Sequence, residues 1–305
     1  MQQIFRILQS IPIPKMYRVH HRIEGPKVED VSTELRTKLT AVPSFDNVSR
    51  GRRIAITVGS RGISNQPSLI KTIVEELRRR EAEPFIIPAM GSHAGAEAEG
   101  QMEMLENLGI TESYVGAPIV SSMEVVQIGT SSTGLPVYVD RHAYEADAVV
   151  LVNRVKAHTS FKGKIESGLL KMSVIGLGKQ KGAEVCHELG FERMEQSISE
   201  IAHLVISKMP ILCGVAVIEN GRHETAEIHV LSREKIEKRE PELMRRANEL
   251  MARVPFKELE AIIIDRIGKD ISGTGLDTNV VGRYHTGQGS GGPSVRRITV
   301  LDLTD

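Results

Sequence analysis

A strand–helix–strand unit at residues 53–87 constrains the fold of this 305-residue chain more than any other feature. Residues 54–58 are apolar and mostly β-branched, which is typical of a buried strand. Pro67 stands where a first helical turn would begin, and apolar residues from Ile70 to Leu77 follow with the spacing of one helix face. Residues 85–87 then predict the next strand. Two strands joined by a helix run parallel with a right-handed crossover, so the sequence predicts an α/β protein.

The rest of the chain extends this pattern. Residues 165–208 are expected to form helical segments interrupted by glycines, and residues 233–253 an exposed, highly charged helix. We therefore expect a large N-terminal domain at 1–250 with a mainly parallel sheet. The start of a smaller C-terminal α/β lobe is expected at 251–305, with the functional site in the cleft between the two. Further strands are expected at residues 125–128, 137–139, 148–152, 212–218, 261–265 and 297–303.

The composition argues against several classes of protein. The formal net charge is zero, Trp is absent and aromatic residues make up only 4% of the chain, which gives no basis for nucleic-acid binding. Two cysteines do not indicate a disulfide framework and are consistent with the cytoplasm. The sequence has no apolar run long enough to span a membrane, and residues 1–17 lack the continuous apolar core of a signal peptide.

Polar residues follow three of the predicted strands directly. Arg61 comes after the first strand, His93 after the second and His158 after the strand at 148–152. Because ligands bind outside the carboxyl ends of parallel strands, we expect these three side chains at one edge of the sheet. An arginine flanked by Gly59 and Gly62 suits a carboxylate or phosphate, because glycines let the backbone approach the ligand. The sequence therefore predicts a site for a small anion.

The residues alone leave the chemistry of this site open. His93 and His158 could be paired acid–base groups, because the histidine pKa lies near the working pH. Together with His187 they could instead bind zinc in a hydrolase, and a non-enzymatic anion-binding protein is a further alternative. Lys171 has apolar neighbours, which would lower its pKa and suit covalent chemistry. Each residue taken alone also has an ordinary surface interpretation, and Cys186 is interpreted as a small buried hydrophobe.

The order and approximate spacing of the site residues resemble the nickel-dependent lactate racemase family, over roughly residues 15–305. Residues 268–279 look like those of a distinct, uncharacterised subgroup. The resemblance implies a nickel pincer nucleotide, which is a pyridinium mononucleotide whose thioamide and thiocarboxylate arms hold nickel. Lys171 would carry this cofactor covalently and His187 would bind the nickel. Further cofactor contacts would come from Ser60, Gly176 and Gly178. The five residues that carry the resemblance are Arg61, His93, His158, Lys171 and His187.

The activity that the resemblance implies is racemisation or epimerisation of a 2-hydroxy acid by proton-coupled hydride transfer. His93 and His158 would face opposite sides of the substrate, and one of them would take the hydroxyl proton while the α-hydrogen leaves as hydride. Arg61 would hold the substrate. The expected partners are this small molecule and the enzymes that synthesise the cofactor. Further substrate contacts are expected from Lys269, Asp277, Asn279 and Arg283.

The second lobe departs from lactate racemase itself. Gly282 stands where a glutamine that contacts the substrate is expected, and His285 lies near the position of a lysine. We therefore expect a substrate other than lactate. The chain also ends soon after the strand at 297–303, whereas the lobe of the family continues, so a reduced or truncated lobe is expected.

Overall fold

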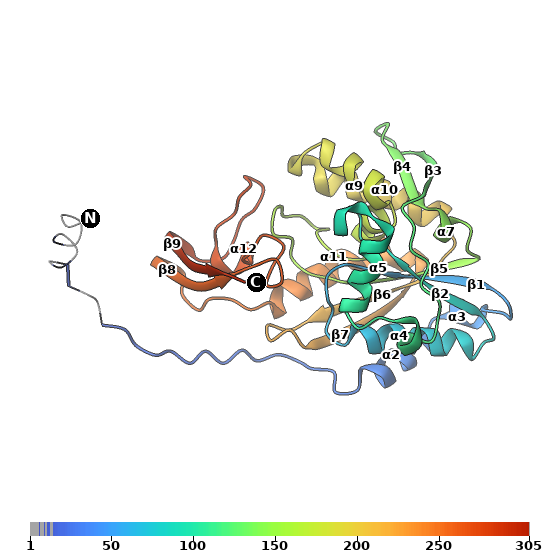
Figure 1. Cartoon of the computed structure of the whole chain (residues 1–305), viewed down its shortest axis with the longest axis horizontal. Helices are drawn as coiled ribbons and strands as arrows, with labels where there is room; N and C mark the ends of the chain where they lie inside the picture. The colour runs from blue at the N-terminus through green and yellow to red at the C-terminus, as the bar shows by residue number, and fades with distance from the viewer. Residues whose placement is uncertain (1–5, 7–8, 10, 13–14, 305) are drawn as a thin grey trace.

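The computed structural model describes residues 6, 9, 11–12 and 15–304. Most of the N-terminal stretch used above to argue against a signal peptide therefore lies outside the described residues. The central feature is a five-stranded sheet in the order β2-β1-β5-β6-β7 (Figure 1). Its first four strands are parallel and β7 is antiparallel to β6, which confirms the predicted mainly parallel sheet. The strands are β1 (Arg53–Val58), β2 (Glu83–Pro88), β5 (Ala148–Arg154), β6 (Ile211–Glu219) and β7 (Thr225–Ser232).

The sheet is covered on both faces because alternate residues of its strands point into two separate cores. Ile54 and Ile56 of β1 belong to one core, whereas Ala55 between them belongs to the other. Strands buried on both faces are continuous apolar runs, which is why the sequence predicted them clearly. The first core contains residues of α2 (Val31–Thr40), α4 (Gln66–Arg78) and α5 (Ala98–Asn107). The second contains residues of α9 (Lys179–Glu188), α10 (Met194–Lys208) and α11 (Arg233–Leu250).

Helix α11 corrects one expectation from the sequence. Its many charges predicted an exposed helix, but Ile236, Leu243 and Ala247 on one face are buried against the sheet. The apolar residues recur at helical spacing, so the charges mark only the solvent face. The sequence analysis also did not predict α2 or β7.

Short elements complete the larger body. β3 (Val125–Thr130) and β4 (Pro136–Asp140) form an antiparallel pair, at the place where the sequence predicted two strands. The remaining elements are α3 (Pro43–Asp46), η1 (Ala94–Ala96), α6 (Glu112–Val115), α7 (Arg141–Tyr144), α8 (Leu169–Lys171), η2 (Met172–Gly176) and η3 (Phe191–Arg193).

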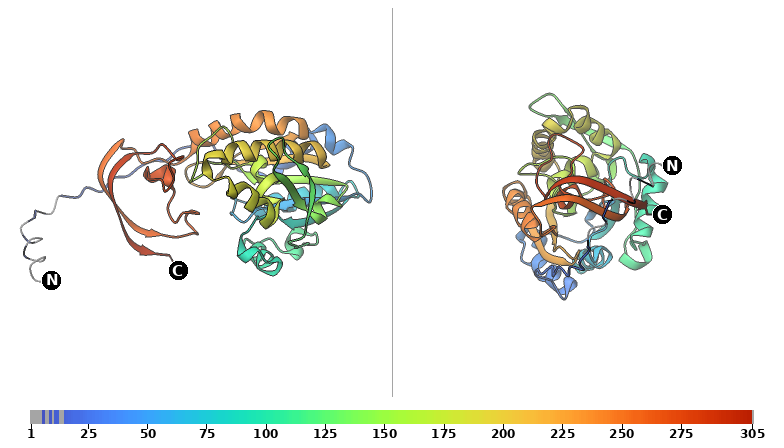
Figure 2. Two further views of the ribbon diagram at one scale, coloured as in Figure 1. Left: turned by 90° about the horizontal axis from the view of Figure 1, so that it is seen from above. Right: turned by 90° about the vertical axis from the view of Figure 1, so that its left-hand side faces the viewer.

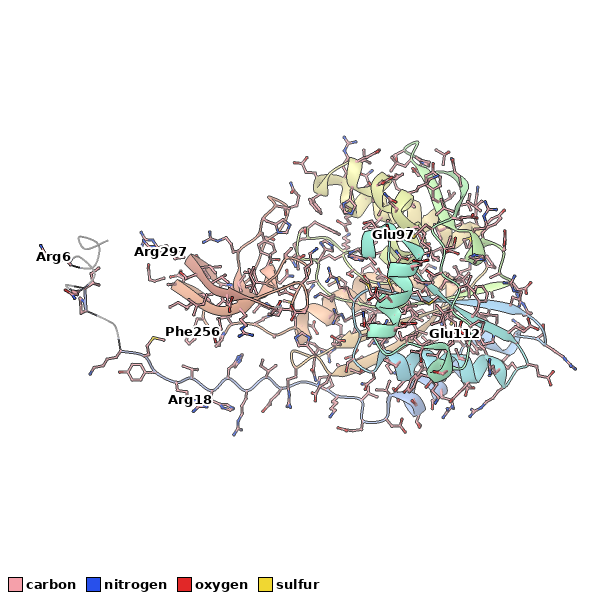
Figure 3. All side chains as sticks on the ribbon, viewed as in Figure 1. Arg6, Arg18, Glu97, Glu112, Phe256 and Arg297 are labelled. Atoms are coloured by element: carbon pink, nitrogen blue, oxygen red, sulfur yellow. The ribbon has the colours of Figure 1, made fainter. Side chains whose placement is uncertain are left out.

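A second, two-stranded parallel sheet lies at one end of the molecule (Figure 2). It consists of β8 (Glu258–Ile267) and β9 (Ser294–Leu303), and the connection between them contains only the short helix α12 (Thr278–Val281). Phe256 and Arg297 mark this part in Figure 3, away from Glu97 and Glu112 on the larger body. The expected division after residue 250 stays a prediction; α11 ends at Leu250. Among the helices described here, none has the length and apolar character needed to cross a bilayer.

Candidate active site

The sheet changes its winding direction between β1 and β5. From β1 the chain passes to β2 on one side and later returns to β5 on the other. The carboxyl ends of the two strands flank such a switch point, where ligands of open α/β sheets bind. Arg61 follows β1, His93 follows β2 and His158 follows β5. The structure therefore gathers these three residues at one sheet edge, as their positions in the sequence predicted.

A cavity of about 1090 Å³ lies at this edge and is lined by residues of both sheets. It is at the upper end of the volumes typical of small-molecule sites. All five residues that carry the family resemblance line it: Arg61, His93, His158, Lys171 and His187.

Lys171 is held in the cavity wall by a short helix and a π-helical turn. It is the last residue of α8, and the π-helical turn η2 follows at once; such turns occur frequently at functional sites. Asn153 at the end of β5 donates a hydrogen bond to the Gly168 carbonyl at 2.7 Å, which fixes the start of α8. Burial and the nearby charge of Arg61 lower the pKa of Lys171 to about 8. Its amine is thus more readily available as a nucleophile than that of an ordinary lysine.

Glu240 of α11 holds α8, the short helix that ends at Lys171. Its carboxylate accepts a hydrogen bond from the backbone N–H of Leu170 at 3.0 Å and is 1% exposed. Burial raises the pKa of Glu240 to about 7. A Cβ atom on Gly168 would lie 2.6 Å from this carboxylate, so only glycine fits there without a shift.

His187 lies on α9, one helix further along the chain, and lines the cavity. Its ring packs edge-on against Phe191 with ring centres 6.2 Å apart. Burial, together with the charge of Lys171, lowers the pKa of His187. The imidazole is therefore neutral near pH 7, which is the form that binds metals. A fully buried ion pair between Lys179 and Asp140, at 3.0 Å, anchors the first turn of α9.

The two other histidines have different surroundings. The His93 Nδ1 atom lies 2.6 Å from the Ser60 hydroxyl oxygen. Burial, followed by the charges of Arg61 and Lys171, lowers the pKa of His93. The pKa of His158 falls further, to about 2, because burial is stronger and Lys171 and Lys156 are near. Both rings are thus neutral near pH 7.

The His158 loop is fixed from both lobes. Its backbone N–H donates to Glu166 at 2.6 Å, and its carbonyl accepts from the Asn279 amide at 3.2 Å. The His158 ring packs against Phe161 with centres 4.4 Å apart. Thr278, the first residue of α12, donates to the Thr159 carbonyl at 2.7 Å. The second lobe is therefore docked directly on this loop.

Arg61 connects the same two parts of the molecule at another point. Its guanidinium donates to the Lys269 carbonyl at 3.3 Å. A Cβ atom on Gly273 would lie 2.7 Å from the Arg61 Nη2 atom, so glycine allows this close approach. An arginine has five N–H donors, and one such bond leaves others for an anionic ligand.

The structure brings some of the predicted binding residues to the cavity and not others. Ser60, Gly176, Lys269 and Asp277 line it, and Asp277 also lies 3.5 Å from Lys156.

Three further predicted contacts stay predictions, and within the described part of the chain these residues are not among those that line the cavity. Asn279 holds the His158 loop, and Arg283 donates to the Val295 carbonyl at 2.7 Å within the second lobe. A Cβ atom on Gly178 would lie 2.2 Å from the Val174 carbonyl, so this glycine is explained by helix packing.

Several polar residues of the site were not predicted. Asn153 lies near the end of β5 and Lys156 just after it, and Glu219 ends β6, where it pairs with Arg154 at 2.5 Å. The rule that located Arg61 would have found these residues as well, because they also lie at the carboxyl ends of parallel strands. Glu240 gives no such signal, because it lies in the middle of a charged helix.

The three-histidine zinc site does not form. Within the described part of the chain, no group of three or more His, Cys, Asp or Glu side chains is arranged to hold a metal ion. His93, His158 and His187 share the cavity without converging on one point. A metal bound by a single protein side chain takes its other donors from water or from another bound molecule.

Comparisons with known proteins concern the family and the fold of the chain. Residues 8–199, which include all five resemblance residues, match the family described as the lactate racemase N-terminal domain. No curated protein matches the chain. The solved structure of the lactate racemase apoprotein from Thermoanaerobacterium thermosaccharolyticum is similar, with a TM-score of 0.58 and 16% identity over 79% of this chain and 61% of that chain. This chain thus spans about three fifths of that protein, and at this identity the likeness concerns the fold. With the family match covering well over half of its length, the chain belongs to the lactate racemase N-terminal domain family.

Proposed function

We propose that this protein interconverts the stereoisomers of a 2-hydroxy acid by means of a nickel pincer nucleotide attached to Lys171. The observation that carries the proposal is the gathering of Arg61, His93, His158, Lys171 and His187 around one cavity. An anion-binding protein would need the arginine, but it would not need a half-buried lysine and three neutral histidines at the same place.

The residues present fit such a cofactor. The cavity of about 1090 Å³ is large enough for a mononucleotide together with a small acid. Lys171, with its pKa lowered to about 8, supplies an amine for covalent attachment. His187 supplies one neutral nitrogen ligand, and the nearby cations Arg61 and Lys156 suit a nucleotide phosphate. Ser60 and Gly176 line the cavity as further contacts.

Side chains of the protein would bind the substrate, transfer the hydroxyl proton and limit the access of water. The bound cofactor would supply the acceptor for the α-hydrogen of the substrate, which departs with its electron pair. Arg61 would hold the substrate carboxylate through charged hydrogen bonds. A neutral histidine beside the substrate would accept the hydroxyl proton and return it. The second lobe, docked on Arg61 and on the His158 loop, would limit the access of water.

The substrate is expected to differ from lactate. Position 282, where the resemblance led us to expect a glutamine, is a glycine with φ +69, and a Cβ atom there would lie 1.9 Å from the Pro293 carbonyl. A side chain therefore does not fit at this position in the present backbone. Arg283, the neighbouring residue that was expected to contact the substrate, donates a hydrogen bond to the Val295 carbonyl. Lys269 and Asp277, which line the cavity, are the second-lobe residues that would contact the substrate.

Intact-protein mass spectrometry with metal analysis tests the proposal. The protein is produced together with enzymes that synthesise the cofactor, as wild type and as the matched variant Lys171→Arg. We expect wild-type protein with the added mass of the nucleotide and about one nickel per chain, and an unmodified variant. An unmodified wild-type protein, in a host where a known lactate racemase becomes loaded, would reject the proposal. Retention of the adduct in Lys171→Arg would reject the role of the lysine.

A further inference from the structure

Two arginines line the same cavity, but their surroundings differ. Arg61 lies in the loop after β1, and Arg154 is the last residue of β5. Arg154 is paired with the Glu219 carboxylate at 2.5 Å, whereas Arg61 donates to the Lys269 carbonyl, which carries no net charge. A guanidinium that already meets a carboxylate attracts a second one only weakly. Of the two arginines, Arg61 is therefore the one available to an anionic ligand.

The ion pair between Arg154 and Glu219 is shielded from solvent. The side chain of Glu219 is 7% exposed and that of Arg154 is 18% exposed. Burial would raise the pKa of Glu219, but its contacts with His223 and Arg154 outweigh burial and keep the pKa below its ordinary value. The carboxylate is thus ionised near pH 7. Loss of its charge would leave Arg154 as an uncompensated cation in the cavity wall.

Arg154 is close enough to the centre of the site to affect it electrostatically. After burial, the charge of Arg154 is the largest cause that lowers the pKa of Lys156. After burial and the charge of Arg61, the charge of Lys156 lowers the pKa of Lys171. These cations therefore lie near one another in the cavity. An uncompensated Arg154 would compete with Arg61 for a carboxylate.

Glu219 also holds the loop that carries Arg61. The second oxygen of its carboxylate accepts a hydrogen bond from the backbone N–H of Ser64 at 2.7 Å. The Ser64 carbonyl accepts a hydrogen bond from the hydroxyl of Thr225, the first residue of β7, at 3.1 Å. Ser64 follows Arg61 by three residues, so the end of β6 and the start of β7 fix this loop. One carboxylate thus neutralises one arginine and positions the other.

We propose that Glu219 is a positioning residue that directs the substrate carboxylate to Arg61, because it neutralises Arg154 and holds the Arg61 loop. The inference rests on the proposed function in one respect, namely that the ligand is a 2-hydroxy acid. Glu219→Gln separates the two effects. Glutamine keeps an oxygen that can accept from Ser64, but it carries no charge, so this variant would open a second carboxylate site at Arg154.

Titration with glycolate, the simplest 2-hydroxy acid, tests the inference on cofactor-free protein. Backbone amide NMR signals report the affinity and the loop that responds. We expect wild type to respond at residues 60–64, and Arg61→Gln to bind about tenfold more weakly, the equivalent of one charged hydrogen bond. Binding should return in Arg61→Gln/Glu219→Gln, with the response moved to residues 153–156. Equally weak binding in Arg61→Gln and in this double variant would overturn the inference.

Two control variants separate the loss of charge from other effects. Arg61→Gln/Glu219→Asp keeps a carboxylate, so it should bind glycolate as weakly as Arg61→Gln. Glu242→Gln frees Arg239 from an ion pair outside the cavity, so adding it to Arg61→Gln should restore nothing. Restored binding in either control would reject the assignment to the Glu219 charge.

A paired replacement keeps the test decisive even where Glu219→Gln alone does not fold. Arg154→Gln/Glu219→Gln removes both charges together and leaves two amides at the same place. Because Arg154 is neutralised in wild type, this variant should bind glycolate as wild type does. A tenfold loss of affinity would show that Arg154 itself binds the acid and would overturn the inference.

Steady-state kinetics of cofactor-loaded protein give a second readout. An acid held at Arg154 would occupy the cavity without reaching Arg61, so the kcat and the KM of Glu219→Gln should fall by the same factor. A raised KM with unchanged kcat would contradict the inference. An absence of turnover in correctly loaded wild type would instead reject the proposed function and leave the glycolate result standing.

Discussion

The carboxylate of Glu240 accepts a hydrogen bond from the backbone N–H of Leu170, one residue before Lys171. A buried side chain on α11 thus holds the short helix that presents the proposed attachment site. The contact joins residues 70 positions apart in the sequence, and it makes the geometry of the lysine depend on a helix outside the residues 8–199 that match the family.

Replacement of Glu240 by glutamine should change how stability depends on pH. Burial raises the pKa of Glu240 from 4.5 to about 7, so the folded protein binds this proton more tightly than the unfolded chain. The stabilising contribution is complete below 4.5 and is lost as the pH rises through about 7, on the order of 3 kcal/mol in total. In urea titrations across this range, the free energy of unfolding of Glu240→Gln should therefore fall less than that of wild type. Glu242→Gln, at an exposed neighbouring position, should behave as wild type, and identical profiles for all three proteins would contradict the prediction.

The amine of Lys171 should react with acylating reagents at lower pH than the exposed lysines. Its pKa is lowered to about 8 by burial and by the charge of Arg61. The rate of acylation, followed by peptide mass spectrometry on cofactor-free protein, should level off above about pH 8. Arg61→Gln removes a positive charge, so it should raise the pKa and move the profile to higher pH. Arg50→Gln, whose side chain is 86% exposed, should leave it unchanged. A Lys171 profile that matches the exposed lysines would disprove the assignment.

Alanine at Gly168 should destabilise the protein and disturb the Lys171 helix. The new Cβ atom would lie 2.6 Å from the Glu240 carboxylate, which would have to give up its bond to Leu170. Overpacking of this kind costs about 1–3 kcal/mol. Gly287→Ala is the control, since nothing lies within 4 Å of a Cβ atom at that position. Chemical denaturation should show the loss for Gly168→Ala only, and equal stability of the two variants would refute the steric argument.

Asn279 should govern the docking of the second lobe on the His158 loop. Asn279→Ala removes the bond to the His158 carbonyl and a partner of Tyr284, at a cost of about 1–3 kcal/mol. Hydrogen exchange measured by mass spectrometry should become faster at residues 158–160. Arg283→Ala is the matched control, because its described bonds stay within the second lobe and should not affect that loop. Unchanged exchange in Asn279→Ala would show that other contacts maintain the docking.

Much of the fold and part of the site could be predicted from the sequence. The buried strands are continuous apolar runs, and the end of a parallel strand places the next polar residue at a known edge, so Arg61, His93 and His158 were found by pattern alone. Lys171 and His187 lie on helices whose position depends on packing; the residues alone left their roles open, and only the family resemblance linked them to one cofactor. The contacts of Glu240 and Asn279 could not be predicted, because nothing local in the sequence indicates a bond to a distant backbone group.

The positions of the site residues in the fold bear on how related proteins could differ in the substrates that they bind. Lys171 and His187, the residues proposed to hold the cofactor, come from one continuous segment, 168–187, which is held by Glu240 of α11 and at the start of α9 by a buried ion pair. The residues that would face the substrate come from separate loops after β1, β2, β5 and β8. Under the proposed function, substitutions in these loops would alter which acid is bound while the segment proposed to hold the cofactor stays intact, so one reaction would apply to many related molecules.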